Sequence, residues 1–473
     1  MQVLHSLMGV NMRLSKIIRD PIFTDRLTFV KWSCNKFIDP LSDTIVDRFC
    51  RQILPQIHHN VKWLDVEPLS MGPIFLAGKY PNLYGLGIYN IREGIIQRLC
   101  HGENRLTDIF KNQISRLIIT ISGYEKKLLT EDEITSVFTQ IFNVFVNLRH
   151  LKLYSPSDVY VQQLSFENKI PTFFSSTLME LHVDLLTFTD CLYLLDGRFN
   201  KLTKFHVKIS MIFPSSLMIK NKKLALYITI DRHRIFIDGN DLKKNIINRL
   251  PRLNKFVFNI QSIISLEGEI HLLSNEEIKR TFTSFIDSGI ISCVDYFLKE
   301  KTGQCHVYSY PYTLKHYHNI TNNFPGGLFK CVRQISLCDE RPFEHEFFLR
   351  ISQSFPLMKK LSVSNLKRPK YKQHRKLKNK NEDFSIIKYH HLTELELTIV
   401  HKDYVELFLD HRRTCLPNNI FLIIDYRPLR KATHNFNREV MRINCAKLIR
   451  LSIYDEFEIS QQLKNYFPHV TQF

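Results

Sequence analysis

Glycine is scarce in this chain, at 15 of 473 residues. Glycine-rich loops cradle phosphate groups in many enzymes, and glycine-rich stretches form collagen-like rods or flexible linkers. The shortage argues against all three. The sequence also lacks a nucleophile elbow, a dinucleotide fingerprint and a kinase signature. His345-Glu346 begins like the HExxH zinc motif, but Leu349 stands where the second histidine is required. We therefore expect no enzymatic activity and no cofactor.

Closely spaced cysteine pairs are absent as well. Ten cysteines are scattered along the chain without a CxxC pair, and the closest two are Cys331 and Cys338. Structural zinc usually needs tighter pairs, so we expect no metal site and interpret the cysteines as free thiols in a reducing compartment. No apolar run is long enough to cross a bilayer, and no secretion signal opens the chain. These absences predict a cytoplasmic or nuclear protein without a membrane partner.

What the sequence does contain is one apolar pattern that occurs eleven times. An apolar residue is followed by two variable residues, a second apolar residue, one variable residue and a third apolar residue. The triplets are Val61-Leu64-Val66, Leu83-Leu86-Ile88, Ile114-Leu117-Ile119, Leu148-Leu151-Leu153, Leu178-Leu181-Val183, Leu202-Phe205-Val207, Leu253-Phe256-Phe258, Val332-Ile335-Leu337, Met358-Leu361-Val363, Leu392-Leu395-Leu397 and Leu448-Leu451-Ile453. This is typical of the strand of a leucine-rich repeat.

The spacing of the triplets predicts the architecture. With two further strands at 224–228 and 420–424, most intervals are 22 to 34 residues, and residues 132–145 form a helical pattern between strands. We expect an α/β leucine-rich-repeat solenoid, a horseshoe with a parallel inner sheet. Repeats should occupy 45–260 and 331–473, separated at 261–330 by divergent repeats or a joint. Ser274 and Glu277 predict a capping box that opens a helix within this middle segment.

Tyrosines and cations mark the surfaces on which binding is expected. Tyr89, Tyr154 and Tyr454 directly follow the last apolar residue of a strand, so alternation should place them on the concave face, as possible partner-binding residues. An insertion at 367–380 forms a basic patch of eight cations: Lys367, Arg368, Lys370, Lys372, Arg375, Lys376, Lys378 and Lys380. The patch is either a nuclear-import or phosphate-contacting segment or, as we favour, an exposed loop kept soluble by its charge.

The net charge is +19, from 65 Lys and Arg against 46 Asp and Glu. Such an excess permits binding to an acidic partner or to nucleic acid. Because most of the charge is spread over short polar stretches, we consider nucleic acid the less probable partner.

The N-terminal residues carry a family resemblance. Val3 to Leu14, followed by Ile17-Ile18-Arg19-Asp20-Pro21-Ile22-Phe23, resembles the second half of an F-box, and residues 1–30 are interpreted as partial F-box-like helices. The whole chain, including Phe355-Pro356-Leu357-Met358 and Tyr389 to Leu395, is similar to F-box proteins with leucine-rich repeats that are expanded in invertebrates such as rotifers. The leading Leu-Pro half of the motif is missing, so we expect either a truncated gene model or lost adaptor binding.

The resemblance implies a function without bond-making chemistry. Such proteins are substrate receptors of cullin-RING (SCF-type) ubiquitin ligases, in which the F-box binds a Skp-family adaptor and the repeats hold a protein substrate for ubiquitination. The positions carried over as adaptor-binding or F-box core residues are Leu4, Leu7, Val10, Leu14 and Ile17. The alternative is a leucine-rich-repeat interaction scaffold without adaptor binding, which is nuclear or binds an acidic partner.

Overall fold

The computed structural model describes residues 19–32, 38–91, 110–121, 130–154, 163–166, 172–211, 223–233, 236–245, 248, 255–266, 272–282, 289–370, 385–454 and 460–471. The chain divides into two compact units. The first unit comprises Met1–Ile264 with Arg280–Ser284, and the second comprises Ser265–Lys279 with Phe285–Phe473.

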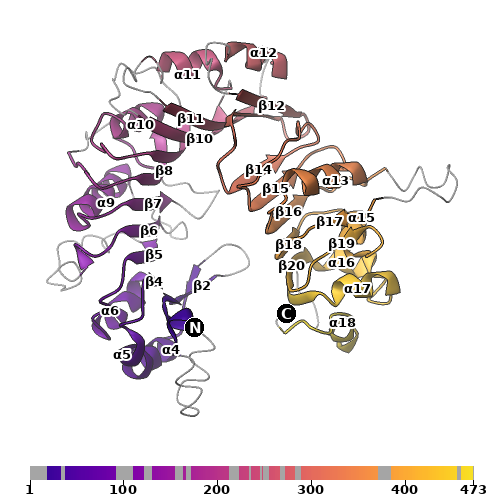
Figure 1. The fold of residues 1–473 in the computed structure, drawn as a ribbon, viewed down its shortest axis with the longest axis horizontal. Coiled ribbons are helices and arrows are strands. Elements are labelled where there is room, and N and C mark those ends of the chain that lie inside the picture. The colour runs from indigo at the N-terminus through magenta and orange to yellow at the C-terminus, as the bar shows by residue number, and fades with distance from the viewer. Residues whose placement is uncertain are drawn as a thin grey trace. The chain divides into compact units, whose positions relative to one another are not determined.

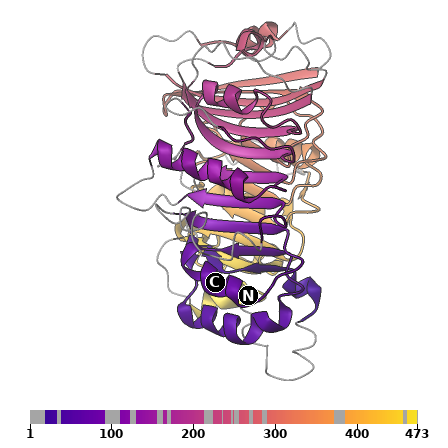
Figure 2. The ribbon, with the colours of Figure 1, turned by 90° about the vertical axis from the view of Figure 1, so that its left-hand side faces the viewer.

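Parallel strands form the body of the first unit (Figure 1). They are β1 (Arg26–Thr28), β4 (Trp63–Val66), β5 (Gly85–Ile91), β6 (Arg116–Ile121), β7 (His150–Tyr154), β8 (Glu180–Thr187), β9 (Lys204–Met211), β10 (Lys223–His233) and β11 (Lys255–Ser265). Figure 2 shows these strands running side by side. Equivalent triplet residues pair across them, for example Leu117 with Leu151, Leu151 with Leu181 and Leu181 with Phe205. These side chains are buried, so the core lies along one face of the sheet.

Most helices of the first unit lie along that buried face (Figure 1). The helical segments of this unit are α3 (Pro21–Thr24), α4 (Asp43–Arg48), the π-helical turn η1 (Phe49–Ile53), α5 (Leu54–Ile57), α6 (Pro68–Leu76), α9 (Glu131–Val144), α10 (Phe188–Leu194) and α11 (Gly239–Asn245). The predicted helix at 132–145 is confirmed, and Thr130 and Glu133 close a capping box at its start. Phe138 and Phe142 of α9 pack their rings against Phe173 and Phe199, with centroids 5.1 Å apart in the closest pairs.

A two-stranded antiparallel ribbon, β2 (Val30–Trp32) with β3 (Ile38–Pro40), follows β1. Val30 and Ile38 of this ribbon form a small hydrophobic cluster with Tyr89, against which Ile118 packs. The ribbon therefore covers part of the sheet face opposite the helices. Asp20 accepts a hydrogen bond from the Ile22 backbone N–H and caps the start of α3.

The second unit contains a six-stranded parallel sheet. Its strands, in order, are β14 (His316–Ile320), β15 (Gln334–Cys338), β16 (Lys360–Ser364), β18 (Glu394–Leu397), β20 (Ile420–Asp425) and β21 (Leu448–Tyr454). A small parallel pair joins β17 (Ile387–Lys388) to β19 (Thr414–Cys415). The helices are α13 (His345–Ser354), α15 (Lys402–Leu409), α16 (Tyr426–Ala432), the 3₁₀ turn η3 (Glu439–Met441), α17 (Arg442–Cys445) and α18 (Gln461–Tyr466).

The predicted leucine-rich-repeat horseshoe is wrong. Strands do form at all eleven triplets, but they do not belong to one continuous parallel sheet. The larger sheet has eleven strands and is mixed, because β12 (Gly289–Phe297) and β13 (Thr302–Tyr310) pair antiparallel at its end, and a separate sheet begins at β14. The triplet requires only a strand that is buried on one face, and many α/β sheets meet that requirement. The fold is α/β with one large mixed sheet and further, separate sheets.

The structure of the segment before the β12–β13 hairpin agrees with the prediction from the sequence. Ser274 and Glu277 form the predicted capping box, and helix α12 (Asn275–Thr281) starts directly after it. In the described residues, no helix has the length and the apolar character that spanning a membrane requires.

Candidate functional site

A row of polar side chains crosses the open face of the first sheet, opposite the helices. His150, Glu180 and Lys204 occupy paired positions on β7, β8 and β9. The Glu180 carboxylate lies at the centre of the row. Its Oε2 atom is 3.5 Å from His150 Nδ1 and 3.8 Å from Lys204 Nζ.

Two residues further along the strands, a stack of rings runs beside this row. His182 pairs with His206, and His206 pairs with Tyr227 of β10. The two imidazole rings lie 3.9 Å apart at 5°, and the His206 and Tyr227 rings lie 4.2 Å apart at 16°. His182 Nε2 is 2.7 Å from Glu180 Oε1, which ties the stack to the row.

Neighbouring groups and burial shift the pKa values of the titratable side chains in this region. The hydrogen bond from His182 is the main cause that lowers the pKa of Glu180 to about 2, so this carboxylate is ionised at neutral pH. Burial lowers the pKa of His182, and the nearby Lys152 acts in the same direction. Burial and Arg116 likewise lower the pKa of His150. Both imidazoles are therefore neutral at pH 7 and above.

Glu180, His182 and His206, here called the Glu–His cluster, have the composition of a metal site. One ligand atom from each residue lies within 4.8 Å of the other two. No metal site was predicted from the sequence, and these three residues were not candidates there. A signal was present, because His182 and His206 occupy the same variable position of consecutive triplets, and a parallel register brings such positions together.

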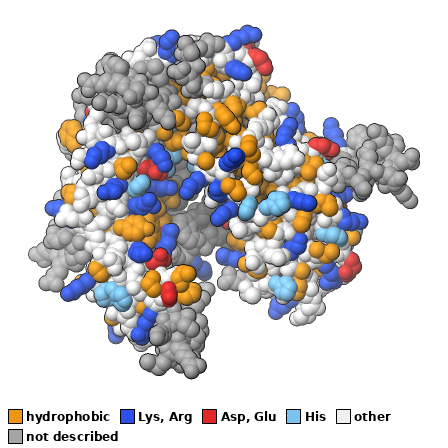
Figure 3. All heavy atoms as spheres, in the orientation of Figure 1, with side chains coloured by type: hydrophobic (Ala, Val, Ile, Leu, Met, Phe, Trp, Pro, Cys, Tyr) orange, Lys and Arg blue, Asp and Glu red, His pale blue; other side chains and the backbone are white. Residues whose placement is uncertain are grey.

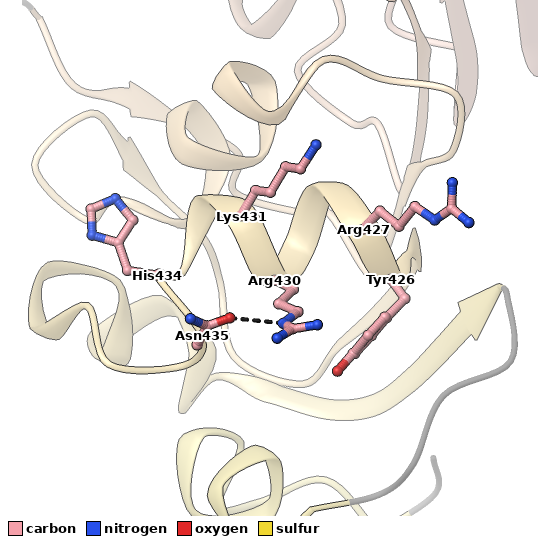
Figure 4. Close-up of a pocket in the computed structure, with 6 residues that line it drawn as sticks. All are labelled: Tyr426, Arg427, Arg430, Lys431, His434 and Asn435. Carbon is pink, nitrogen blue, oxygen red and sulfur yellow. Dashed lines mark hydrogen bonds between the residues drawn. The ribbon is translucent and has the colours of Figure 1, made fainter.

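A pocket of about 520 Å³ lies along helix α16 in the second unit. It is lined by Tyr426, Arg427, Arg430, Lys431, His434 and Asn435 (Figure 4). The sequence Tyr-Arg-Pro-Leu-Arg-Lys-Ala places the cations at i, i+3 and i+4 on the exposed side of the helix, while Leu429 and Ala432 are buried. This helix was not among the sites predicted from the sequence, although the spacing of its cations is visible there.

The far wall of this α16 pocket is a turn with unusual backbone geometry. His434, Asn435 and Phe436 have φ angles of 51°, 55° and 63°, in the left-handed region that non-glycine residues rarely adopt. The buried Thr433 holds the turn, since its hydroxyl donates to the Leu429 carbonyl and accepts from the Phe436 backbone N–H. Such strain persists where the surrounding structure enforces it, and it is concentrated at functional sites.

The turn fixes one of the pocket cations. Asn435 Oδ1 accepts a hydrogen bond of 2.7 Å from Arg430 Nε, and the Asn435 backbone N–H donates to the Arg430 carbonyl. In Figure 4 the Arg430 guanidinium lies between Asn435 and the Tyr426 ring, while the Arg427 and Lys431 side chains extend away from it. None of these three cations forms an ion pair with a described residue. On the face of the molecule drawn in Figure 3, Lys and Arg side chains are more frequent than Asp and Glu.

No protein-family model matches the chain, and no curated protein matches it in sequence. The assignment of a function therefore depends on the chemistry of these two sites.

The three predicted tyrosines have different environments. Tyr89 is buried, and its hydroxyl donates a hydrogen bond of 3.0 Å to Asp65. Its ring lies over Gly87 of the same strand and packs with Val30 and Ile38 of the β2–β3 ribbon. Burial is the main cause that raises the pKa of Tyr89 and of Tyr154, which is partly exposed. Tyr454 is also partly exposed but belongs to the sheet of the second unit. The tyrosines thus do not share one sheet.

The described part of the basic patch is anchored at its start. Arg368 Nε lies 3.2 Å from the buried carboxylate of Asp403, and the Lys370 backbone N–H donates to Glu344. Lys299 beside Lys367 lowers the pKa of Lys367. The remaining cations of the patch lie outside the described residues: Lys372, Arg375, Lys376, Lys378 and Lys380. The same is true of the F-box positions Leu4, Leu7, Val10, Leu14 and Ile17.

Proposed function

We propose that this chain is a non-catalytic protein-binding module whose partner presents an acidic surface to helix α16. The observation that carries the proposal is the α16 pocket, in which three cations without an ion partner among the described residues line one open cavity. Cations that are not neutralised within their own protein attract and orient an acidic partner.

Arg430 is suited to anchor one carboxylate of that partner. Its Nε atom is held by Asn435, which fixes the plane of the guanidinium and leaves the two terminal nitrogens for a ligand. A preorganised arginine loses less side-chain entropy on binding and can bind a carboxylate through two parallel hydrogen bonds.

The positions of the other cations favour a partner with several acidic groups. The Arg427 and Lys431 side chains extend away from the Arg430 guanidinium in Figure 4, so the three cations do not converge on one small anion. A row of acidic side chains on a protein surface can meet all three. Tyr426 adds a rigid ring at the edge of the pocket, as is common where proteins bind one another.

Charge reversal within the α16 pocket tests the proposal. We expect Arg427→Glu/Arg430→Glu/Lys431→Glu to weaken binding of a fluorescent ten-residue glutamate peptide by about tenfold or more, because three favourable contacts become repulsive. Fluorescence anisotropy of the full chain measures the dissociation constant.

A matched variant distinguishes the effect of the pocket cations on binding from the effect of the net charge. Lys315, Lys330 and Lys359 are exposed cations of the same unit, and reversing them changes the net charge by the same amount. Lys315→Glu/Lys330→Glu/Lys359→Glu should leave peptide binding nearly unchanged. Equal losses in both triple variants would contradict the proposal. Binding of a 20-base-pair DNA that is lost only in the pocket variant, with peptide binding retained, would indicate a nucleic-acid site instead.

The substrate-receptor role remains a prediction that the F-box resemblance alone supports. If it holds, the purified chain captures a purified Skp-family adaptor, and Leu4→Glu/Leu7→Glu abolishes capture because it places charges in the adaptor-binding segment. Leu69→Glu on α6 is the control, since Leu69 is already 78% exposed. A wild-type chain that fails to bind the adaptor removes this role and leaves the acidic-partner proposal intact.

A further inference from the structure

We propose that Glu180, His182 and His206 form a binding site for a divalent transition-metal ion, with zinc as the expected occupant. The Glu–His cluster belongs to the first unit and is separate from the α16 pocket in the second. The site does not depend on the function proposed above. Two imidazoles and a carboxylate are a ligand set that proteins use for zinc.

The distances between the three ligand atoms suit a single ion. An ion at the centre of three atoms that lie at most 4.8 Å apart is at most about 2.8 Å from each, whereas zinc bonds to histidine and carboxylate are about 2.0–2.2 Å long. Shifts of less than about 1 Å at the ligand atoms close this difference in distance. The two imidazole rings must also turn out of their parallel stack, because each ring binds a metal in its own plane. Because the strands hold His182 and His206 in register, the backbone does not need to move.

Two of the three ligands, Glu180 and His182, are also in the protonation state that a metal requires. Metal binding needs an ionised carboxylate and neutral imidazoles. Glu180 is ionised, and burial keeps the pKa of His182 below its usual value. The hydrogen bond between Glu180 and His182 has to be exchanged for bonds to the ion, and Tyr227 packs against the far side of His206 and limits its rotation.

One cation competes with the metal. Lys204 Nζ lies 3.8 Å from Glu180 Oε2, and its side chain is 56% exposed, so it can withdraw into solvent when the ion binds. The competition lowers the affinity of the site and supplies a test, because removal of the lysine charge should strengthen binding.

An ion held by three protein ligands has further coordination positions. The side chains of the cluster are only partly buried on the open face of the sheet, so these positions are accessible to water or to a donor group of another molecule. Such an ion would also join β8 to β9 and so stabilise the first unit, because binding to the folded state alone raises stability.

Calorimetric titration of the full, chelator-treated chain with ZnCl₂ at pH 7.5 tests the site. We expect one ion per chain, and a loss of affinity of about tenfold or more in His182→Ala and in His206→Ala. Glu180→Gln, which keeps the shape of the side chain, should weaken binding as well. Lys204→Met should tighten it. The visible spectrum of bound Co²⁺ should change in the histidine variants if these rings are ligands.

His316 and His318 provide the control. Their rings also stack, with centroids 5.0 Å apart, but within the described residues they are not part of a cluster with metal-ligand geometry. His316→Ala/His318→Ala should bind zinc like the wild type. The proposal is overturned if the wild type binds no zinc, if the control loses as much affinity as His182→Ala, or if Lys204→Met weakens binding. Circular dichroism of each variant establishes that it is folded.

Discussion

At the scale of single residues, two glycines of β5 allow aromatic side chains to lie against the strand. A methyl group on Gly85 would collide with the Trp63 ring, and one on Gly87 would collide with Asp65 and Tyr89. These groups are packed around the buried Asp65 carboxylate, which accepts hydrogen bonds from Trp63 Nε1 at 2.6 Å and from the Tyr89 hydroxyl at 3.0 Å. The absence of side chains at both glycines is therefore part of the packing.

Replacement of Gly87 by alanine should destabilise the first unit. We expect Gly87→Ala to cost about 1–3 kcal/mol, because the added methyl group displaces Tyr89 or breaks its bond to Asp65. Gly72→Ala is the control, since a methyl group there meets nothing within 4 Å and helix α6 gains about 0.5–1 kcal/mol. Urea unfolding followed by tryptophan fluorescence measures both, because the only tryptophans, Trp32 and Trp63, belong to the first unit. A Gly87→Ala chain as stable as the wild type would refute this packing.

At the scale of elements, the β12–β13 hairpin lies in the middle segment, for which divergent repeats or a joint were predicted. Strand β13 carries the buried His306 into an aromatic cluster, with its ring 4.7 Å from Tyr317 and 5.0 Å from Tyr308. Burial, assisted by His318 and His316, lowers the pKa of His306 to about 3. The hairpin is thus packed around an imidazole that stays neutral.

The second unit should therefore lose stability in mild acid. In the unfolded chain His306 takes up a proton near pH 6.5, whereas the folded chain resists until about pH 3, so stability falls as the pH drops through that window. The loss from this residue amounts to about 2 kcal/mol between pH 7 and pH 5. Denaturant unfolding at the two pH values, followed by near-ultraviolet circular dichroism, measures it.

Comparison of two variants isolates the contribution of His306. His306→Gln removes the titrating group and should flatten the pH dependence, while the exposed His469→Gln should leave it unchanged. An identical pH dependence in His306→Gln and in the wild type would show that another group is responsible.

At the scale of the whole molecule, predictions of caps and single strands were correct, but the arrangement of the strands in sheets did not follow from them. The capping boxes at Thr130 and Ser274 and the strand at each triplet were predictable, because caps and inward alternation depend on neighbouring residues. The horseshoe was wrong, because the direction in which β12 and β13 pair and the start of a second sheet at β14 depend on contacts between distant segments.

The sequence by itself determined which residues face the core, since a period of two along each strand leaves only one face for Leu117, Leu151 and Leu181. Only the tertiary structure decided what the other face and the surface carry. Parallel register brought His206 beside His182 and Glu180, and a left-handed turn positioned Arg430 in the α16 pocket. These groups meet because strand pairing and chain reversal bring separate segments together, and a linear pattern of apolar residues contains no information about that pairing.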